Sequence, residues 1–147
     1  AQLAFFHPST KASSSIKKVL PAVMQSSAYL KDRYSQPIYG APGGIASLNF
    51  KDQVWWKSSG NGAENPYKLL PPVFSDMPQE MLEDMDSDEG LAIAEGGAAT
   101  TAFARLQFDN LPTEERKHIE AALLRYCELD TLAMVMIYEA WREWLNR

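Results

Sequence analysis

The clearest periodic pattern of apolar residues lies near the C-terminal end of the chain, where it predicts one long helix over residues 114–146. A helix turns by about 100° per residue, so positions three and four apart return to one side. The apolar stripe consists of Ile119, Leu123, Tyr126, Ala133, Met134, Ile137, Trp141 and Trp144. The opposite side carries Lys117, Arg125, Glu128, Glu139 and Arg142. We expect the stripe to face the core and the charged side to face water.

Asp130 interrupts this stripe near its middle. It follows Tyr126 by four residues and precedes Met134 by four, so all three side chains share a face. A buried carboxylate without a partner is costly, so it must become neutral, find a donor or bind a cation. Two interpretations stay open. Asp130 caps an element or pairs with a buried Arg or Lys, or it is a metal ligand at the rim of a cleft beside Tyr126.

Two further helices are predicted. One covers residues 97–108, where Ala102 and Leu106 recur at helical spacing. The other is short and follows a run of serines that can cap its start, and Pro21 is expected at a bend or in its last turn. Lys17 and Lys18 point away from its apolar side. They are candidate contacts to a phosphate backbone, and an ordinary solvated face explains them equally well.

The regular pattern breaks up between about residues 25 and 90, which we interpret as an insertion rich in Gly and Pro. A strand over residues 48–56 is predicted to enter a turn at 58–62. Residues 65–72 are expected to be extended, and the acidic run 75–89 to be solvated. Trp55 and Trp56 offer rings for stacking on bases, although packing in the core is the expectation we favour.

Composition narrows the functional classes. The net charge of −5 argues against a broad basic surface for nucleic acid. The single cysteine, Cys127, excludes an internal disulfide framework, and we expect a packed thiol in a cytoplasmic protein. No apolar run approaches the roughly 20 residues of a membrane span, so we expect no membrane partner. His7, next to Pro8, is either a ligand or base, or more simply a turn residue.

Several blocks in order resemble a prokaryotic domain family, domain of unknown function 2779. That family is related to ribonuclease H-like 3′–5′ exonucleases with four acidic ligands and a Tyr-x-x-x-Asp motif. Tyr126 and Asp130 fit that motif here. The blocks are HP at residues 7–8, SIKKVLPA at 15–22, NPYKLLPP at 65–72, EGGAA at 95–99 and LRYCELDTLAMV at 124–135.

The resemblance implies an α/β parent domain with a mixed sheet and flanking helices, and a metal-dependent exonuclease activity. Acidic side chains of such enzymes hold two Mg²⁺ or Mn²⁺ ions, which activate water and stabilise the leaving oxygen. By resemblance, Asp130 is a direct metal ligand and Tyr126 orients or helps deprotonate the attacking water. The implied partner is the 3′ end of single-stranded DNA or RNA.

The first two acidic motifs of the resembled enzymes have no counterpart here, so we expect residues 1–147 to be the C-terminal part of one exonuclease-like domain. Such a part should be mainly α, with at most a short β element, and catalytically inactive alone because one carboxylate cannot hold the metal ions. Its apolar helix would lack a cover, which predicts a homo-oligomer or rearranged packing. The alternative function is a non-catalytic scaffold that binds a protein partner through Trp55, Trp56 and Phe74.

Overall fold

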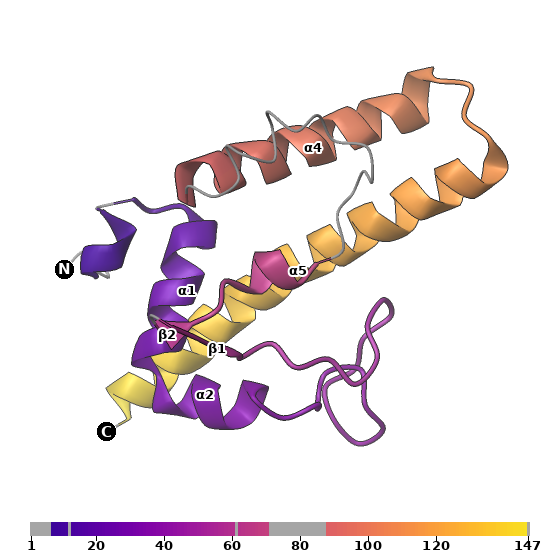
Figure 1. Ribbon diagram of the computed structural model, residues 1–147. Coiled ribbons are helices and arrows are strands. Elements are labelled where there is room, and N and C mark those ends of the chain that lie inside the picture. The colour runs from indigo at the N-terminus through magenta and orange to yellow at the C-terminus, as the bar shows by residue number, and fades with distance from the viewer. Residues whose placement is uncertain (1–6, 12, 61, 71–87, 147) are drawn as a thin grey trace. The chain divides into compact units, whose positions relative to one another are not determined.

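Helices make up most of the described chain in the computed structural model of the protein (Figure 1). The structure describes residues 7–11, 13–60, 62–70 and 88–146. The chain divides into two compact units, one formed by Ala1–Leu69 with Leu129–Arg147 and the other by Leu70–Glu128. The mainly helical character expected from the sequence is confirmed, and the described sheet has only two strands.

The first unit begins with a 3₁₀ turn, η1 (Pro8–Thr10), and two helices, α1 (Ile16–Ser26) and α2 (Ala28–Tyr34). Strands β1 (Ser58–Ser59) and β2 (Gly62–Ala63) form an antiparallel hairpin in which Ser58 faces Ala63. A second 3₁₀ turn, η2 (Pro66–Leu69), follows. The unit is completed by the C-terminal part of the long helix α5 (Thr113–Leu145).

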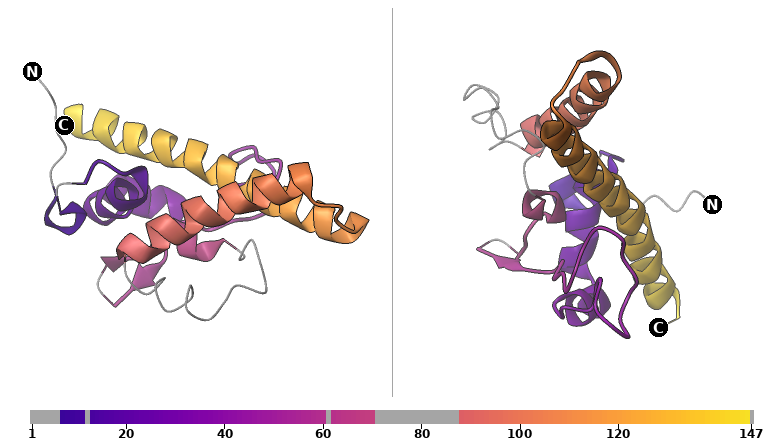
Figure 2. Two further views of the ribbon diagram at one scale, coloured as in Figure 1. Left: turned by 90° about the horizontal axis from the view of Figure 1, so that it is seen from above. Right: turned by 90° about the vertical axis from the view of Figure 1, so that its right-hand side faces the viewer.

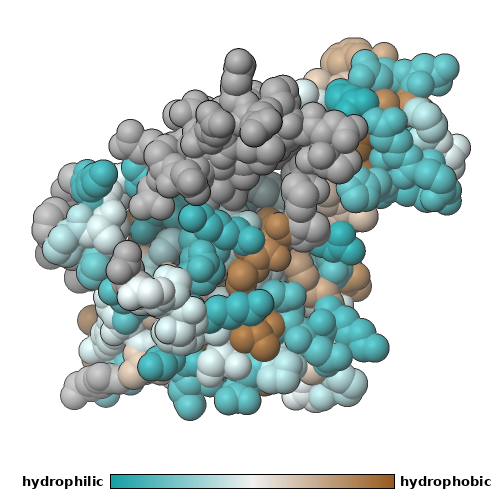
Figure 3. Space-filling model, in the orientation of Figure 1, coloured by the Kyte–Doolittle hydropathy of each residue, from teal (hydrophilic) through white to brown (hydrophobic). Residues whose placement is uncertain are grey.

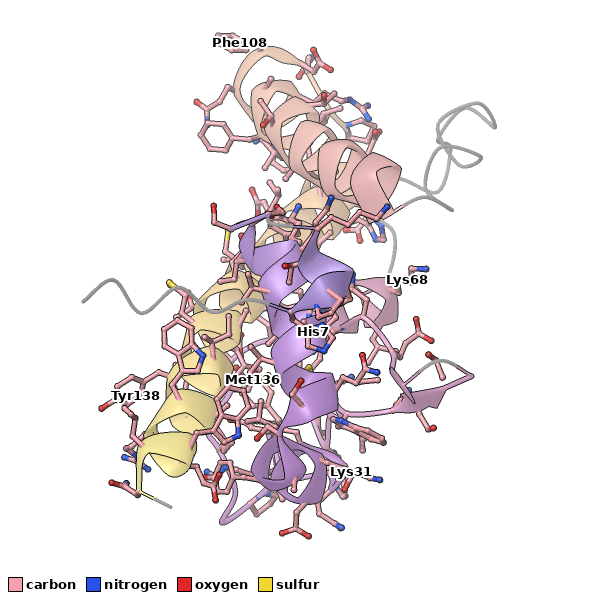
Figure 4. All side chains as sticks on the ribbon, turned by 90° about the vertical axis from the view of Figure 1, so that its left-hand side faces the viewer. His7, Lys31, Lys68, Phe108, Met136 and Tyr138 are labelled. Atoms are coloured by element: carbon pink, nitrogen blue, oxygen red, sulfur yellow. The ribbon has the colours of Figure 1, made fainter. Side chains whose placement is uncertain are left out.

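The core of the first unit lies between α1, α2 and the C-terminal part of α5, and both views of Figure 2 show α1 and this part of α5 side by side. Figure 4 shows Met136 on the side of α5 that faces α1, and Tyr138 on the other side. The buried side chains of these three helices are Leu20, Ala22, Val23, Met24, Leu30, Tyr34, Leu129, Leu132, Ala133, Met136, Ile137 and Ala140.

The predicted stripe of the long helix is correct in part. Ala133 and Ile137 are buried, but Met134 and Trp141 are 58% and 39% exposed. The helix is apolar on nearly all sides in this region, so periodicity alone does not decide which side meets the core. The buried side is rotated from the predicted one, and Asp130 therefore lies at its edge and is half-buried.

α1 is longer than predicted. Pro21 lies inside it, and the helix continues for five residues to Ser26. An interior proline removes one N–H group from the helical ladder and crowds the preceding turn. Burial of Leu20, Val23 and Met24 around it offsets this cost and keeps the segment helical.

The strand predicted over residues 48–56 is wrong. Within this segment Gln53 forms an isolated bridge with Tyr39, and the described strands come later, at 58–63. Phe50 and Trp55 leave the alternating pattern of a strand because both pack against Tyr39, with ring centroids 4.9–5.9 Å apart within the cluster. Trp55 is fully buried, which confirms that it packs in the core.

The proline-rich segment also differs from its expected extended form, because residues 66–69 wind into the 3₁₀ turn η2. Residues 71–72 and most of the acidic run, 75–87, lie outside the described residues. Asp88, near the end of that run, begins a helix.

The second unit contains α4 (Asp88–Phe108) and the N-terminal part of α5. α4 includes the helix predicted over 97–108 and begins earlier. Arg105 bridges the two helices of this unit, because one nitrogen lies 2.6 Å from Glu115 and another 3.2 Å from Asp109. On the face shown in Figure 3, hydrophilic residues cover most of the described surface, with hydrophobic residues in small groups.

Candidate functional site

Asp130 lies in α5 and accepts a hydrogen bond from the hydroxyl of Tyr67, with 2.5 Å between the Tyr67 oxygen and Oδ1. Within the described ranges, the Tyr67 hydroxyl is the only hydrogen-bond partner of the Asp130 carboxylate. No Lys or Arg of these ranges forms an ion pair with Asp130. Asp130 as a whole is half-buried. Pairing with a buried Arg or Lys, which was part of one of the two open interpretations, is not seen among the described residues.

Tyr67 is held in place by local structure. Only 2% of it is exposed, and it is the second residue of η2. Its backbone N–H donates to Oδ1 of Asn65 over 3.2 Å, and the N–H of Lys68 donates to the Asn65 carbonyl over 3.0 Å. The Asn-Pro pair thus starts a turn that directs the phenol toward α5.

Lys17, from the first turn of α1, joins this group. Its Nζ lies 5.5 Å from the centroid of the Tyr67 ring, a cation–π distance. Lys18 is the next residue of the same turn, about 100° further round the helix, and is half-buried. The structure thus gathers Lys17, Tyr67 and Asp130 from three elements of the first unit, and we call them the Asp130 cluster.

Tyr126, the other residue of the Tyr-x-x-x-Asp pattern, lies one helical turn before Asp130 in α5 and is half-buried. Its place on the helix agrees with the spacing that the sequence predicts, since α5 runs without interruption through both positions.

The Asp130 cluster contains one carboxylate, that of Asp130. Mg²⁺ and Mn²⁺ prefer carboxylate oxygens, and a half-buried carboxylate held by a neutral hydroxyl fits one such ligand. In the part of the chain that the structure describes, no group of three or more His, Cys, Asp or Glu side chains could hold a metal ion. One carboxylate does not make a metal site by itself, and the described residues do not complete one around Asp130.

His7 has a structural role in the fold. Its Nδ1 accepts a hydrogen bond from the backbone N–H of Ser9 over 3.2 Å and lies 2.7 Å from the Ser9 hydroxyl. It thereby caps η1 (His7 is labelled in Figure 4). This arrangement agrees with the simpler expectation of a turn residue.

Trp56 and Cys127 were also singled out from the sequence. The Trp56 indole N–H donates to the Met24 carbonyl over 3.1 Å, and Lys31 Nζ lies 5.0 Å from its ring. Cys127 is exposed, which contradicts the expectation of a packed thiol, because this side of α5 faces away from the core. Phe74 lies outside the described residues.

A second tyrosine–carboxylate pair lies further along α5. The Tyr34 hydroxyl donates to Oε2 of Glu139 over 2.8 Å, and Arg33 Nε lies 3.9 Å from the same oxygen. Burial, together with this hydrogen bond, raises the pKa of Tyr34 above its ordinary value of 10.0. The Glu139 side chain is only 16% exposed, so the prediction that it lies on the solvated side of the helix is wrong.

The comparisons with known proteins found no relative of this chain. No family model matches the chain, and no curated protein or solved structure does so either. The assignment of the Asp130 cluster therefore depends on its own chemistry and on the resemblance of the sequence blocks.

Sequence reasoning missed the pairing of Tyr67 with Asp130. The two residues are 63 positions apart, and no local pattern connects them. The only signal was that Tyr67 and Lys17 both belong to blocks that carry the family resemblance.

Among the described helices, none is both long and apolar enough to cross a bilayer.

Proposed function

We propose that this chain is the C-terminal part of a metal-dependent 3′–5′ exonuclease-like domain that hydrolyses phosphodiester bonds of DNA or RNA. The proposal rests on the hydrogen-bond partner and the burial of Asp130. A carboxylate at the edge of a core needs a hydrogen-bond donor, a basic partner or a cation. Among the described residues Asp130 accepts from the Tyr67 hydroxyl and forms no ion pair with a Lys or Arg, and it is half-buried.

In this proposal Asp130 is a direct ligand of Mg²⁺ or Mn²⁺. The bound ions would supply an activated water and stabilise the leaving oxygen. Tyr126, one turn earlier, would orient the attacking water or help to remove its proton. Lys17 and Lys18, at the start of α1, would contact the phosphate backbone of a single-stranded 3′ end. The remaining acidic ligands would come from outside the described residues.

The scaffold alternative is less well supported. It depends on exposed aromatic side chains that a partner protein could cover. Trp55 is fully buried, and Trp56 is half-buried and hydrogen-bonded within the chain. Neither tryptophan therefore supports a docking surface in this part of the chain.

The proposal predicts that Asp130→Asn in the complete protein lowers Mn²⁺-dependent release of nucleotides from a 3′-labelled single strand by more than about a hundredfold. This exceeds the loss typical for an outer partner of a metal ligand, because the substitution removes the charge of the ligand itself. The matched control is Asp32→Asn, which changes an exposed acid of α2 and should leave the rate unchanged. Undiminished activity of Asp130→Asn would refute the assignment.

A further inference from the structure

The long helix α5 carries a second stripe of residues, which lies outside the core. Its six members are all exposed and recur at alternating spacings of three and four: Leu124, Cys127, Thr131, Met134, Tyr138 and Trp141. This spacing places them on one side of the helix, and we call them the α5 seam. Its four large apolar members are 39–60% exposed. A solvated helix face is normally polar, so the α5 seam is expected to meet another surface.

The α5 seam lies on the side of the helix opposite the core. Met136 is fully buried and follows Met134 by two positions, which turn a helix by about 200°. Ala140 is fully buried and stands in the same relation to Tyr138. Figure 4 shows Met136 on the side that faces α1 and Tyr138 on the other side. A helix that packs on the α5 seam therefore does not meet α1.

The spacing of the α5 seam indicates which kind of partner fits it. Positions that alternate by three and four repeat every 3.5 residues on average, the repeat by which two helices pack along their length. From its first to its last residue the seam covers about 25 Å of helix. α5 is already helical in the single chain, so little ordering is needed when a second helix binds. The fitting partner is a helix with the same spacing, and α5 of a second copy of this chain has it.

Residues beside the seam favour an antiparallel pair of helices. Glu128, Val135 and Arg142 are seven positions apart, so they form one flank of the seam. In an antiparallel pair this flank meets the same flank of the partner in reverse order, which sets Glu128 against the partner's Arg142 twice. In a parallel pair it would meet the opposite flank, where Ile137 is only 8% exposed. The antiparallel order is therefore the one that brings opposite charges together.

The same register gives every residue of the α5 seam a partner in the seam of the second copy. The facing pairs are Leu124 with the partner's Trp141, Cys127 with the partner's Tyr138, and Thr131 with the partner's Met134, each formed twice about a two-fold axis.

We propose that α5 pairs antiparallel with α5 of a second copy of this chain, and that Glu128 and Arg142 determine the orientation and register of the pair. Arg142 is placed for this role, because it is exposed and its guanidinium lies 6.0 Å from the centroid of the Tyr138 ring in the seam. The inference goes beyond the proposed function and does not depend on a metal at Asp130.

Charge reversal tests the pairing, with the dissociation constant of the dimer measured by sedimentation of the 147-residue chain at low salt. Glu128→Arg and Arg142→Glu each set two like-charge pairs in every dimer, so each should raise the dissociation constant about tenfold. The double variant exchanges the charges and should return it to within about threefold of the wild-type value. Circular dichroism verifies that each variant stays helical.

The matched control is Glu114→Arg. It makes the same charge change at an exposed acid of α5 that lies beyond the end of the partner helix in this register. The dissociation constant of this variant should equal that of the wild type.

A disulfide reports the orientation independently. Two Cys127 residues of an antiparallel dimer are about 16 Å apart along the axis, too far for a disulfide, whereas Cys127 faces the partner's Tyr138. Oxidation of Tyr138→Cys should therefore link two chains through Cys127 of one and the introduced cysteine of the other. Peptide mapping by mass spectrometry identifies this link, and the wild-type chain should form none.

Three outcomes would overturn the inference. A wild-type chain that stays monomeric shows that a second copy does not cover the seam, which is then open to another partner or to a further segment of a longer protein. A double variant that does not recover the dimer excludes the pairing of Glu128 with Arg142. Disulfides between identical positions show a parallel pair. The proposed function is tested separately, because none of these results bears on Asp130.

Discussion

Two buried tyrosines donate their hydroxyls to carboxylates of the same helix, Tyr67 to Asp130 and Tyr34 to Glu139. Both rings are at most 2% exposed, and a buried phenol needs an acceptor. The sequence showed that Asp130 was unusual, because an acid stood among apolar residues. It could not show the partner, because contacts between residues far apart in the chain follow from the fold and leave no local pattern.

Tyr34 makes the stability of the protein depend on alkaline pH. Burial raises the pKa of its hydroxyl above 10.0, so the folded state keeps a proton that the unfolded chain releases above that pH. The stability that the retained proton of Tyr34 gives to the folded state is complete below pH 10.0. As the pH rises beyond this value, the free energy of unfolding falls by about 1.4 kcal/mol per pH unit. Tyr34→Phe should therefore lose stability less steeply than the wild type above that pH.

Urea unfolding of both proteins over a series of alkaline pH values measures this difference. The variant starts from a lower stability at neutral pH, by about 1–3 kcal/mol, because Glu139 loses a hydrogen bond to a charged group. Parallel loss of stability in the two proteins would show that Tyr34 ionises equally easily in the folded and unfolded states.

At the scale of elements, α1, α4 and α5 lie where helices were predicted, whereas α2 falls in the segment 25–90 that was interpreted as an irregular insertion. Helices predicted from apolar residues that recur every three to four positions lie close to their predicted places. One example is α5, which covers Thr113–Leu145. The segment 48–56 has β-forming residues, yet its aromatic side chains join a cluster with Tyr39 instead of pairing in a sheet. Short apolar segments are governed by such tertiary contacts more than by propensity.

The loop between α2 and β1 contains a close approach of its backbone at Gly40. Gly40 has a φ of 76°, and a Cβ placed on it would lie 2.1 Å from the Phe50 carbonyl oxygen. Gly43 has almost the same φ, 77°, with nothing within 4 Å of its Cβ position. The two glycines therefore form a matched pair in which only one carries a steric clash.

Gly43→Ala should cost about 1–2 kcal/mol of unfolding free energy, because an alanine adopts a positive φ with strain. Gly40→Ala should cost more than about 3 kcal/mol, since the clash with Phe50 adds to that strain. Urea unfolding of the two variants measures the difference. Equal losses would mean that the loop moves freely away from Gly40.

For the whole molecule, the sequence predicted a mainly helical chain with an uncovered apolar helix. The side of α5 that faces away from the core exposes Met134, Val135, Tyr138, Trp141 and Leu145, by 39–75%. These positions recur at spacings of three and four, and so form a continuous apolar face. An exposed apolar face of this kind is typical of an interaction surface.

The 147-residue chain is therefore predicted to self-associate, which light scattering over a range of concentrations measures. Tyr138→Glu places a charge in the exposed face of α5 and should shift the chain toward monomer. Leu48→Glu is the control, because Leu48 is 99% exposed and lies apart from that helix in the sequence. A wild-type chain that stays monomeric at high concentration would contradict the prediction.

The account as a whole depends on Asp130 as a metal ligand, and nuclear magnetic resonance of the complete protein with ¹³C-labelled aspartate carboxyl groups tests this most directly. Sub-stoichiometric Mn²⁺ broadens the signal of a carboxylate that binds it, whereas signals of exposed acids such as Asp32 stay sharp. We predict that the Asp130 signal broadens first and that Asp130→Asn removes this effect. An Asp130 signal that stays sharp while the protein binds Mn²⁺ elsewhere would contradict the account.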